Sequence, residues 1–124
     1  MFDAVVATLP AGDIARAKAF YREKLDLEPF QDEAEGSARY QVGDTMLLIY
    51  PSEFHGTNQA TAAGFSVSDI TAVVAELGSR GVVFEELDYG DMKTVEGILE
   101  MPNGTRGAWF KDSEGNTIGV FQDA

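Results

Sequence analysis

Residues 13–25 of this chain are DIARAKAFYREKL. Asp13 is a residue type that caps helix N-termini, and apolar side chains follow it at helical spacing. The apolar run at residues 3–9, just before the cap, is typical of a short strand. The stretch therefore predicts a strand followed by an amphipathic helix. The apolar stripe of that helix consists of Ile14, Ala17, Tyr21 and Leu25, with Phe20 beside it.

The same arrangement returns in the second half of the chain. An apolar run at residues 62–67 precedes Asp69, and a second apolar helical face follows until Gly81, which would end the helix. Strand and helix thus occur twice in the same order, which indicates an internal duplication. The second apolar face consists of Ile70, Val73, Val74 and Leu77.

Three strand-like segments follow each predicted helix. Asp13 and Asp69 are 56 residues apart, whereas Leu48 and Gly119, in the last strand of each half, are 71 apart, so the second half is 15 residues longer. These extra residues lie around 90–104, and the sequence assigns them no role. The predicted strands are residues 28–32, 38–42 and 45–50 in the first half, where Gly43-Asp44 forms a tight turn, and 82–89, 105–111 and 117–122 in the second.

The pattern predicts an α+β fold of two tandem βαβββ modules that form a cupped mixed sheet with the helices on the outside. At 124 residues the chain is the size of one domain. Module 1 would span about residues 1–52, a linker about 53–60 and module 2 about 61–124. A sheet covered by a helix on one face leaves its other face open, so the duplication predicts a cleft between the modules.

Composition excludes several classes of function. The formal charge of -12 repels nucleic acid and anionic membrane surfaces, so neither is an expected partner. The chain has no cysteine, which excludes disulfides and thiolate metal sites. Its first residues show neither a signal sequence nor a membrane span, and we expect a cytoplasmic protein.

Three motifs together resemble the vicinal oxygen chelate superfamily, which includes glyoxalase I, extradiol dioxygenases, and bleomycin and fosfomycin resistance proteins. The motifs are residues 13–21, the matching Asp69-Ile70, and Trp109-Phe-Lys-Asp-Ser-Glu-Gly-Asn116. They span nearly the whole chain, and their order makes coincidence improbable. The resemblance implies the duplicated fold, and it also implies that two copies of the chain pair as a homodimer with two clefts.

Enzymes of this superfamily hold a divalent metal with His, Gln or Glu side chains on the first and last strands of each module. The matching positions here carry Val6, Leu48, Ala62 and Gly119, none of which offers a side-chain donor. We therefore expect no metal, no other cofactor and no catalytic residue. The departure is similar to the antibiotic-binding members, which use the same cup without a metal.

Side chains alternate between the two faces of a strand, so the residues beside the vacated metal positions predict the lining of the cup. On this parity Phe110 packs under a helix while Trp109 faces the cleft. Aromatic rings and a thioether suit a flat organic ligand, and the polar side chains can orient it. The predicted ligand-binding residues are Arg39, Gln41, Met46, Leu48, Tyr50, His55, Trp109, Lys111 and Phe121. The alternatives are that some of these are core residues or that the strand register is shifted by one.

His55 is the sole histidine and falls in the linker rather than at a family ligand position. An imidazole at the rim of the cleft could exchange a hydrogen bond with a ligand, although a lone loop histidine is more often simply exposed. The favoured function is a metal-free binding protein for a small organic molecule, such as an antibiotic or a metabolite. The alternatives are a lyase, isomerase or dioxygenase of the superfamily, with Tyr50, His55 or Arg39 acting without a metal, and an accessory domain whose cleft is filled.

Overall fold

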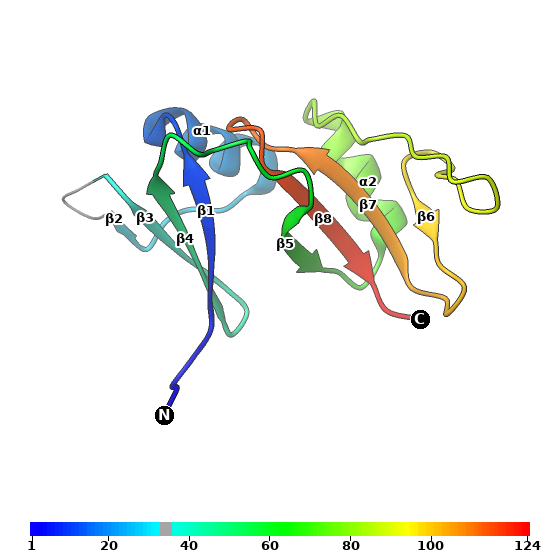
Figure 1. The fold of residues 1–124 in the computed structure, drawn as a ribbon, viewed down its shortest axis with the longest axis horizontal. Coiled ribbons are helices and arrows are strands. Elements are labelled where there is room, and N and C mark those ends of the chain that lie inside the picture. Colours follow the sequence, from blue (N-terminus) through cyan, green and yellow to red (C-terminus); the bar gives the residue numbers. More distant parts are fainter. Residues whose placement is uncertain (33–35) are drawn as a thin grey trace.

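The structure is a computed structural model that describes residues 1–32 and 36–124. Its order of elements confirms two tandem βαβββ modules (Figure 1). No helix within the described ranges is long and apolar enough to cross a membrane. Module 1 contains β1 (Val6–Ala11), α1 (Ile14–Leu25), β2 (Gln31–Asp32), β3 (Ala38–Val42) and β4 (Thr45–Pro51), and module 2 contains β5 (Thr61–Ser66), α2 (Ile70–Ser79), β6 (Leu99–Glu100), β7 (Arg106–Lys111) and β8 (Thr117–Gln122).

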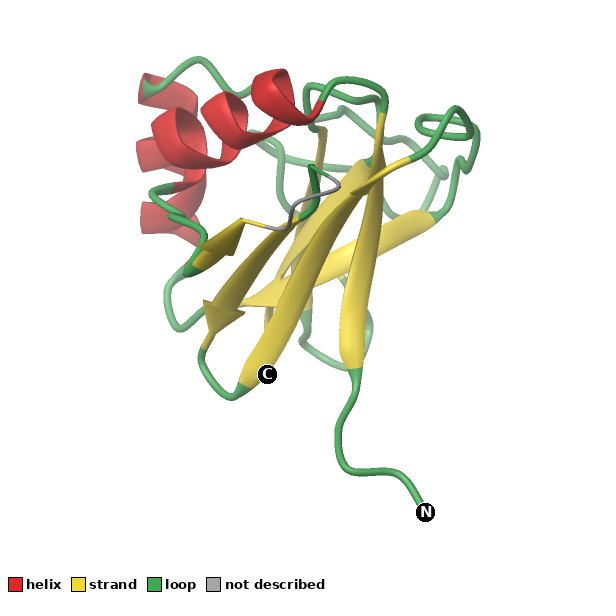
Figure 2. Ribbon diagram, turned by 90° about the vertical axis from the view of Figure 1, so that its left-hand side faces the viewer, coloured by secondary structure: helices red, strands yellow, loops and turns green. Residues whose placement is uncertain are grey.

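Each module forms a four-stranded mixed sheet, in the order β1-β4-β3-β2 or β5-β8-β7-β6. The first and last strands of each module pair in parallel, and the hairpins pair antiparallel. Both helices lie on the same side of the sheets (Figure 2), so one face of each sheet is covered and the other is left open. The two sheets meet along the edge strands β1 and β5.

The predicted helix caps are confirmed. The side chain of Asp13 accepts a hydrogen bond from the backbone N–H of Arg16, at 3.0 Å, and Asp69 accepts one from Ala72, at 3.1 Å. These bonds satisfy N–H groups that have no partner within the first turn of a helix. The second helix ends at Ser79, just before Gly81, whose φ of 92° is the left-handed conformation that glycine tolerates.

Two predicted strands are shorter than expected. The first strand begins at Val6 rather than at residue 3, because pairing with β4 starts only there. The segment at 28–32 is a strand only over Gln31–Asp32, where it pairs with β3. The tight Gly43-Asp44 turn is present between β3 and β4, and Gly43 has the positive φ of 57° that such a turn requires.

The predicted strand at residues 82–89 is wrong. Its backbone touches β7 at a single bridge, Phe84 to Phe110, and through the N–H of Glu85, which donates to the carbonyl of Trp109 at 2.7 Å. Beyond Glu85 the chain leaves the sheet for a loop, and β6, at Leu99–Glu100, takes the edge position instead. Residues 82–89 therefore form an irregular segment rather than a strand.

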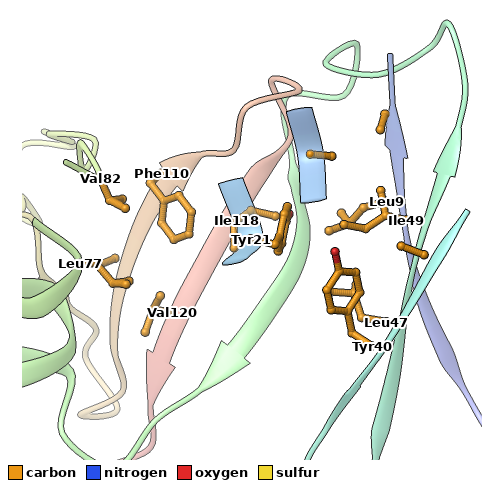
Figure 3. Packing of buried hydrophobic residues seen from close by; sticks show 14 of the residues in the cluster. Leu9, Tyr21, Tyr40, Leu47, Ile49, Leu77, Val82, Phe110, Ile118 and Val120 are labelled. Atoms are coloured by element: carbon orange, nitrogen blue, oxygen red, sulfur yellow. The ribbon is translucent and has the colours of Figure 1, made fainter. Parts of the chain in front are cut away.

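The core lies between the sheets and the helices and runs through both modules (Figure 3). Tyr21 of α1 lies between the two modules, with its ring centroid 6.1 Å from that of Tyr40 in the first module. Phe110 is 1% exposed and contacts Phe20 of α1 and Phe84, which confirms that it packs under the helices. The covered faces of both sheets thus share one core, which fixes the opposite faces as the open ones.

The loop at residues 112–116 joins module 2 to the start of α1. Glu114, whose side chain is 1% exposed, accepts hydrogen bonds from the backbone N–H groups of Gly12 and Asp13, each at 3.0 Å. The guanidinium of Arg16 donates two further bonds to this carboxylate, each at 2.9 Å. The bonds from Arg16 are the main reason that the pKa of Glu114 falls from its ordinary 4.5 to about 2, and Ser113 and Asp13 add to the effect against the cost of burial.

A second buried carboxylate in the same loop strengthens this junction. Asp112 accepts a hydrogen bond from the hydroxyl of Tyr21, at 2.7 Å, and another from the side-chain amide of Asn116, at 3.1 Å. The same amide also donates to the carbonyl of Pro10 in β1, at 2.9 Å. Burial, together with the nearby Asp112, raises the pKa of Tyr21 well above its ordinary value. The two modules are therefore held by polar contacts as well as by the core.

Candidate functional site

The open face of the second sheet has a floor of backbone rather than of side chains. Gly64 on β5 and Gly119 on β8 are partners in the sheet, Gly107 on β7 is the partner of Phe121, and the Phe121 ring lies close to all three glycines. A Cβ atom on Gly119 would lie 2.6 Å from that ring, and one on Gly64 would lie 2.7 Å from it. Glycine is thus required at these positions because an aromatic ring lies flat against the sheet.

Trp109 extends this aromatic surface along β7. Its ring centroid is 5.6 Å from that of Phe121, in an edge-to-face arrangement, and its indole N–H donates to the hydroxyl of Thr61 at 3.1 Å. The side chain is half-buried, whereas its neighbour Phe110 is fully buried on the other face. The predicted alternation of Trp109 and Phe110 is confirmed, and the indole is fixed in one orientation before any ligand arrives.

A hollow of about 370 Å³ lies over Trp109. Gln59 of the linker and Thr61 and Thr117 of the sheet contribute polar side chains, and Ala60 lies next to them in the lining. The other walls come from the segment that leaves the sheet after Glu85, which includes the extra residues of module 2. The side chains that this segment contributes are Glu85, Leu87, Tyr89, Met92, Leu99 and Met101.

These wall residues are absent from the predicted site. The predicted strand at 82–89 assigned the first three of them to a sheet, and no periodicity marks the three that follow. One signal was present, because two of the four methionines of the chain, Met92 and Met101, fall in this segment. Thioethers adapt to irregular ligand shapes, so their concentration in a loop is typical of a binding surface.

Lys111 lies next to this hollow on β7. Its ammonium group donates to the hydroxyl of Thr117 and lies 3.4 Å from Oε1 of Glu85. Half of the Lys111 side chain is exposed, whereas Thr117 is buried. Lys111 therefore borders the hollow from the solvent side, and it neutralises part of the charge of Glu85.

The predicted site residues of module 1 lie on the open face of the first sheet. Leu48 is in register with both Thr8 and Arg39, so these three side chains form one row across that face. Gln41 donates through its amide to the carbonyl of Gly43, at 2.8 Å, which ties it to the turn. Tyr50 lies further along β4 on the same face, two residues beyond Leu48. None of the four predicted residues among them contributes to the hollow over Trp109; these are Arg39, Gln41, Leu48 and Tyr50.

Met46 lies at a second hollow, of about 360 Å³, between the modules. This hollow runs from the Gly43 turn to β5, where Gly64 and Ser66 form its other side. The ring of Phe121 lies close to Gly64, one of the residues that line this hollow. The structure thus distributes the predicted residues over both modules rather than gathering them in a single pocket.

His55 lies at neither of these hollows. Its Nδ1 is 2.8 Å from the carbonyl oxygen of Glu114, and since a carbonyl only accepts, Nδ1 carries the proton. The ring covers Gly12, where a Cβ atom would lie only 2.4 Å from Nε2. His55 therefore holds the linker against the module junction, where it borders an open depression with Ser52 and Glu53.

The four family metal positions do not fit a metal in this chain. The open-face backbone at Gly119 is covered by Phe121, and Ala62 is the extra residue of a β-bulge. Because of that bulge Ala62 packs against the core, and Thr61 takes its expected place facing Trp109. The position of Ala62 in the cleft was therefore predicted wrongly. Val6 and Leu48 complete the set without a donor atom, and among residues 1–32 and 36–124 no three His, Asp or Glu side chains could together hold a metal ion.

Two βαβββ modules, helices on one side and an open face on the other, define a class of α+β proteins built by duplication. Within this class the chain belongs to the Glyoxalase/Bleomycin resistance protein/Dioxygenase superfamily, whose family model matches residues 3–120. This confirms the resemblance inferred from the motifs. Among curated proteins no relative was found.

Solved structures share the fold at low sequence identity. A glyoxalase/bleomycin resistance protein from Catenulispora acidiphila is 23% identical, with a TM-score of 0.71 and 98% of each chain covered. TnmS3, an antibiotic-binding protein from a Streptomyces species, is 24% identical, with a TM-score of 0.71 over 100% of this chain and 99% of that one. The fosfomycin resistance protein FosX from Mesorhizobium loti is 13% identical, with a TM-score of 0.67 over 100% and 94%.

Proposed function

We propose that this protein binds a small organic molecule, without a metal, in the hollow over Trp109. The observation that carries the proposal is the fixed, half-buried indole at the base of a hollow of about 370 Å³. That volume lies within the range of small-molecule sites, which are mostly apolar with a few polar groups. The mixture of an indole, a phenol and two thioethers with Thr61, Gln59 and Glu85 matches this description.

The roles named for two structural neighbours are compatible with sequestration, and the fold is also found in a lyase. TnmS3 is an antibiotic-binding protein and FosX a fosfomycin resistance protein, so the fold accommodates both binding and resistance. The present chain lacks donors at the positions where metal-dependent members have them. The proposed role is accordingly to hold an antibiotic or a metabolite, which would protect the cell or store the compound.

We propose further that two copies of the chain pair as a homodimer. The N-terminal arm stands off the body of the molecule (Figure 1), and its Met1, Phe2 and Val5 are exposed by 111%, 88% and 82%. The open face of the first sheet adds Leu48 and Tyr50 to this uncovered apolar surface. A second copy of the chain would cover these exposed apolar side chains.

In this dimer the open face of module 1 would lie opposite module 2 of the other copy. The residues Arg39, Met46 and Tyr50 would then face a ligand that rests on Trp109. This arrangement would unite the predicted site residues that a single chain leaves apart. The family resemblance supports it, because members commonly build each cleft from two chains.

Native mass spectrometry of the protein purified from its own source tests the proposal. We expect an organic adduct on the wild type that is lost from the Trp109→Phe variant or much reduced, since phenylalanine shortens the stacking surface and removes the bond to Thr61. Elemental analysis of the same sample should find no stoichiometric Mn, Fe, Ni or Zn. A stoichiometric metal together with an activity that a chelator abolishes would refute the proposal.

A further inference from the structure

The side chains that line the hollow over Trp109 favour a ligand of one sign of charge. Glu85 supplies the single charged side chain among its lining residues in the described part of the chain. The faces of Trp109 and Tyr89 carry the negative side of an aromatic quadrupole, and the thioethers of Met92 and Met101 are polarisable. A positive charge is favoured by all of these groups, whereas an anion is favoured by none of them.

The segment that forms the outer wall adds a field of the same sign. Residues 85–100 contain six acidic residues and one lysine, so their formal charge is -5. Glu86, the immediate neighbour of Glu85, faces elsewhere, because its Oε2 accepts a hydrogen bond from Thr94 at 2.7 Å. The segment thus provides a general negative potential, and Glu85 provides the local contact.

The ion pair between Glu85 and Lys111 is weak enough for another cation to replace the lysine. The Nζ–Oε1 distance is 3.4 Å, longer than a hydrogen-bonded pair, and Lys111 has a second partner in Thr117. Half of the Lys111 side chain is in solvent, so the ammonium can move away from Glu85 at low cost. A cationic group entering the hollow could therefore take its place beside the carboxylate.

We propose that the ligand of this hollow is a flat organic cation, with its ring on Trp109 and Tyr89 and its positive group directed to Glu85. This inference rests on the proposed function and narrows it to one chemical class. The aromatic walls contribute through burial and cation–π attraction, and the carboxylate selects the sign of the charge. Neutral and anionic molecules of the same shape bind more weakly.

Three quinolines of nearly equal shape test the charge preference: N-methylquinolinium, quinoline and quinoline-4-carboxylate, which are cationic, neutral and anionic at pH 7.5. Isothermal titration calorimetry on the purified full chain gives the affinity of each. We expect the cation to bind about tenfold more tightly than the neutral compound, as one charge contact near a surface would give. The anion should bind most weakly, and added salt should reduce the difference.

Two substitutions that each remove one negative charge distinguish the direct contact of Glu85 with the ligand from the general negative potential of the segment. Glu85→Gln should weaken binding of N-methylquinolinium by about fivefold to tenfold, whereas Glu86→Gln should change it by less than about twofold. Lys111→Met should strengthen cation binding, because it removes the competing ammonium group. All three positions are at least partly exposed, so the variants are expected to fold.

The outcomes distinguish this inference from the function on which it rests. Equal binding of the cation and the neutral compound, lost in the Trp109→Phe variant, would overturn the cation preference and leave the hollow as a site for flat organic molecules. Equal effects of the Glu85→Gln and Glu86→Gln substitutions would also overturn it. If none of the three quinolines binds, the cation assignment fails, while the native adduct still tests the proposed function independently.

Discussion

The indole of Trp109 meets the ring of Phe121 edge to face, with the ring centroids 5.6 Å apart and the planes at 78°. Both rings lie on the open face of the second sheet, above a floor of three glycines. The aromatic surface is therefore already assembled in the free chain. A ligand that stacks on it loses little entropy in ordering the protein.

Truncation should cost much more stability at Phe110 than at its neighbour Trp109. Phe110→Ala removes a fully buried ring and should lower the free energy of unfolding by about 3 to 5 kcal/mol. Trp109→Ala removes a half-buried ring on the open face and should lower it by only about 1 kcal/mol. Urea denaturation followed by circular dichroism measures both, since the second variant has no tryptophan left to report. A larger loss for Trp109→Ala than for Phe110→Ala would show that the faces of β7 are reversed.

Gly119 and Phe121 should show strong coupling. Gly119→Ala places a methyl group where the Phe121 ring now lies, at 2.6 Å, so the ring must move. We expect a loss of about 1 to 3 kcal/mol of stability and a shift in the emission of Trp109, which contacts the same ring. In a Phe121→Ala background the same substitution should cost less, since the contact at 2.6 Å is gone and the Trp109 Nε1 atom, at 3.2 Å, is the near neighbour that remains. Additive losses in the double variant would mean that Phe121 does not cover the glycine floor.

Glu114→Gln should lower the free energy of unfolding by an amount that depends on pH. The folded chain lowers the pKa of Glu114 from 4.5 to about 2, so its carboxylate stabilises the folded state above pH 4.5. This contribution shrinks as the pH falls from 4.5 through about 2, and it is fully lost only below the folded pKa, where the carboxyl is protonated in both the folded and the unfolded chain. At pH 7 the variant should be less stable by about 2 kcal/mol, a value reduced because Arg16 is half exposed.

Unfolding free energies of the wild type and the variant, measured between pH 7 and about pH 2.5, check this prediction. The gap between the two curves should narrow below pH 4.5 and be smallest at the acid end. Glu23→Gln serves as the control, because this residue is exposed on the same helix and should give parallel curves. A constant gap between wild type and Glu114→Gln at every pH would contradict the proposed role of the ionised carboxylate.

Much of the fold could be predicted from local signals. Capping aspartates and apolar periodicity fixed both helices, since Asp13 and Asp69 each bind a backbone N–H within their own first turn. The period of two along β7 likewise predicted that Phe110 is buried and Trp109 is not. These features depend on neighbours within a few residues, which a single sequence displays directly.

The features that could not be predicted depend on contacts between distant segments. The hollow over Trp109 exists because the chain after Glu85 leaves the sheet, and nothing in the local pattern distinguishes that path from a strand. The bulge at Ala62 shifts one residue out of the predicted alternation. The bond from Arg16 to Glu114 joins residues 98 positions apart, so their pairing appears only in the folded chain. Of the predicted site residues, Trp109 is the one that lines this hollow, and the side chains that the loop contributes were missed.

The proposed dimer gives the last prediction, which concerns the open face of the first sheet. Sedimentation equilibrium should give a mass of about twice the chain's 13.4 kDa, decreasing on dilution if the pairing is reversible. Leu48→Glu should weaken the dimer by at least about tenfold, because a carboxylate buried without a partner in the interface costs more than one kcal/mol. The monomer should remain folded, since Leu48 lies on the uncovered face and not in the core. Val83→Glu is the matched control: Val83 is 81% exposed but lies at the start of the irregular segment, away from β4, and should leave the mass unchanged. A mass of 13.4 kDa at every concentration would refute the dimer. The open face of module 1 would then remain uncovered, and the ligand would have to bind through Trp109 and the loop of module 2 alone.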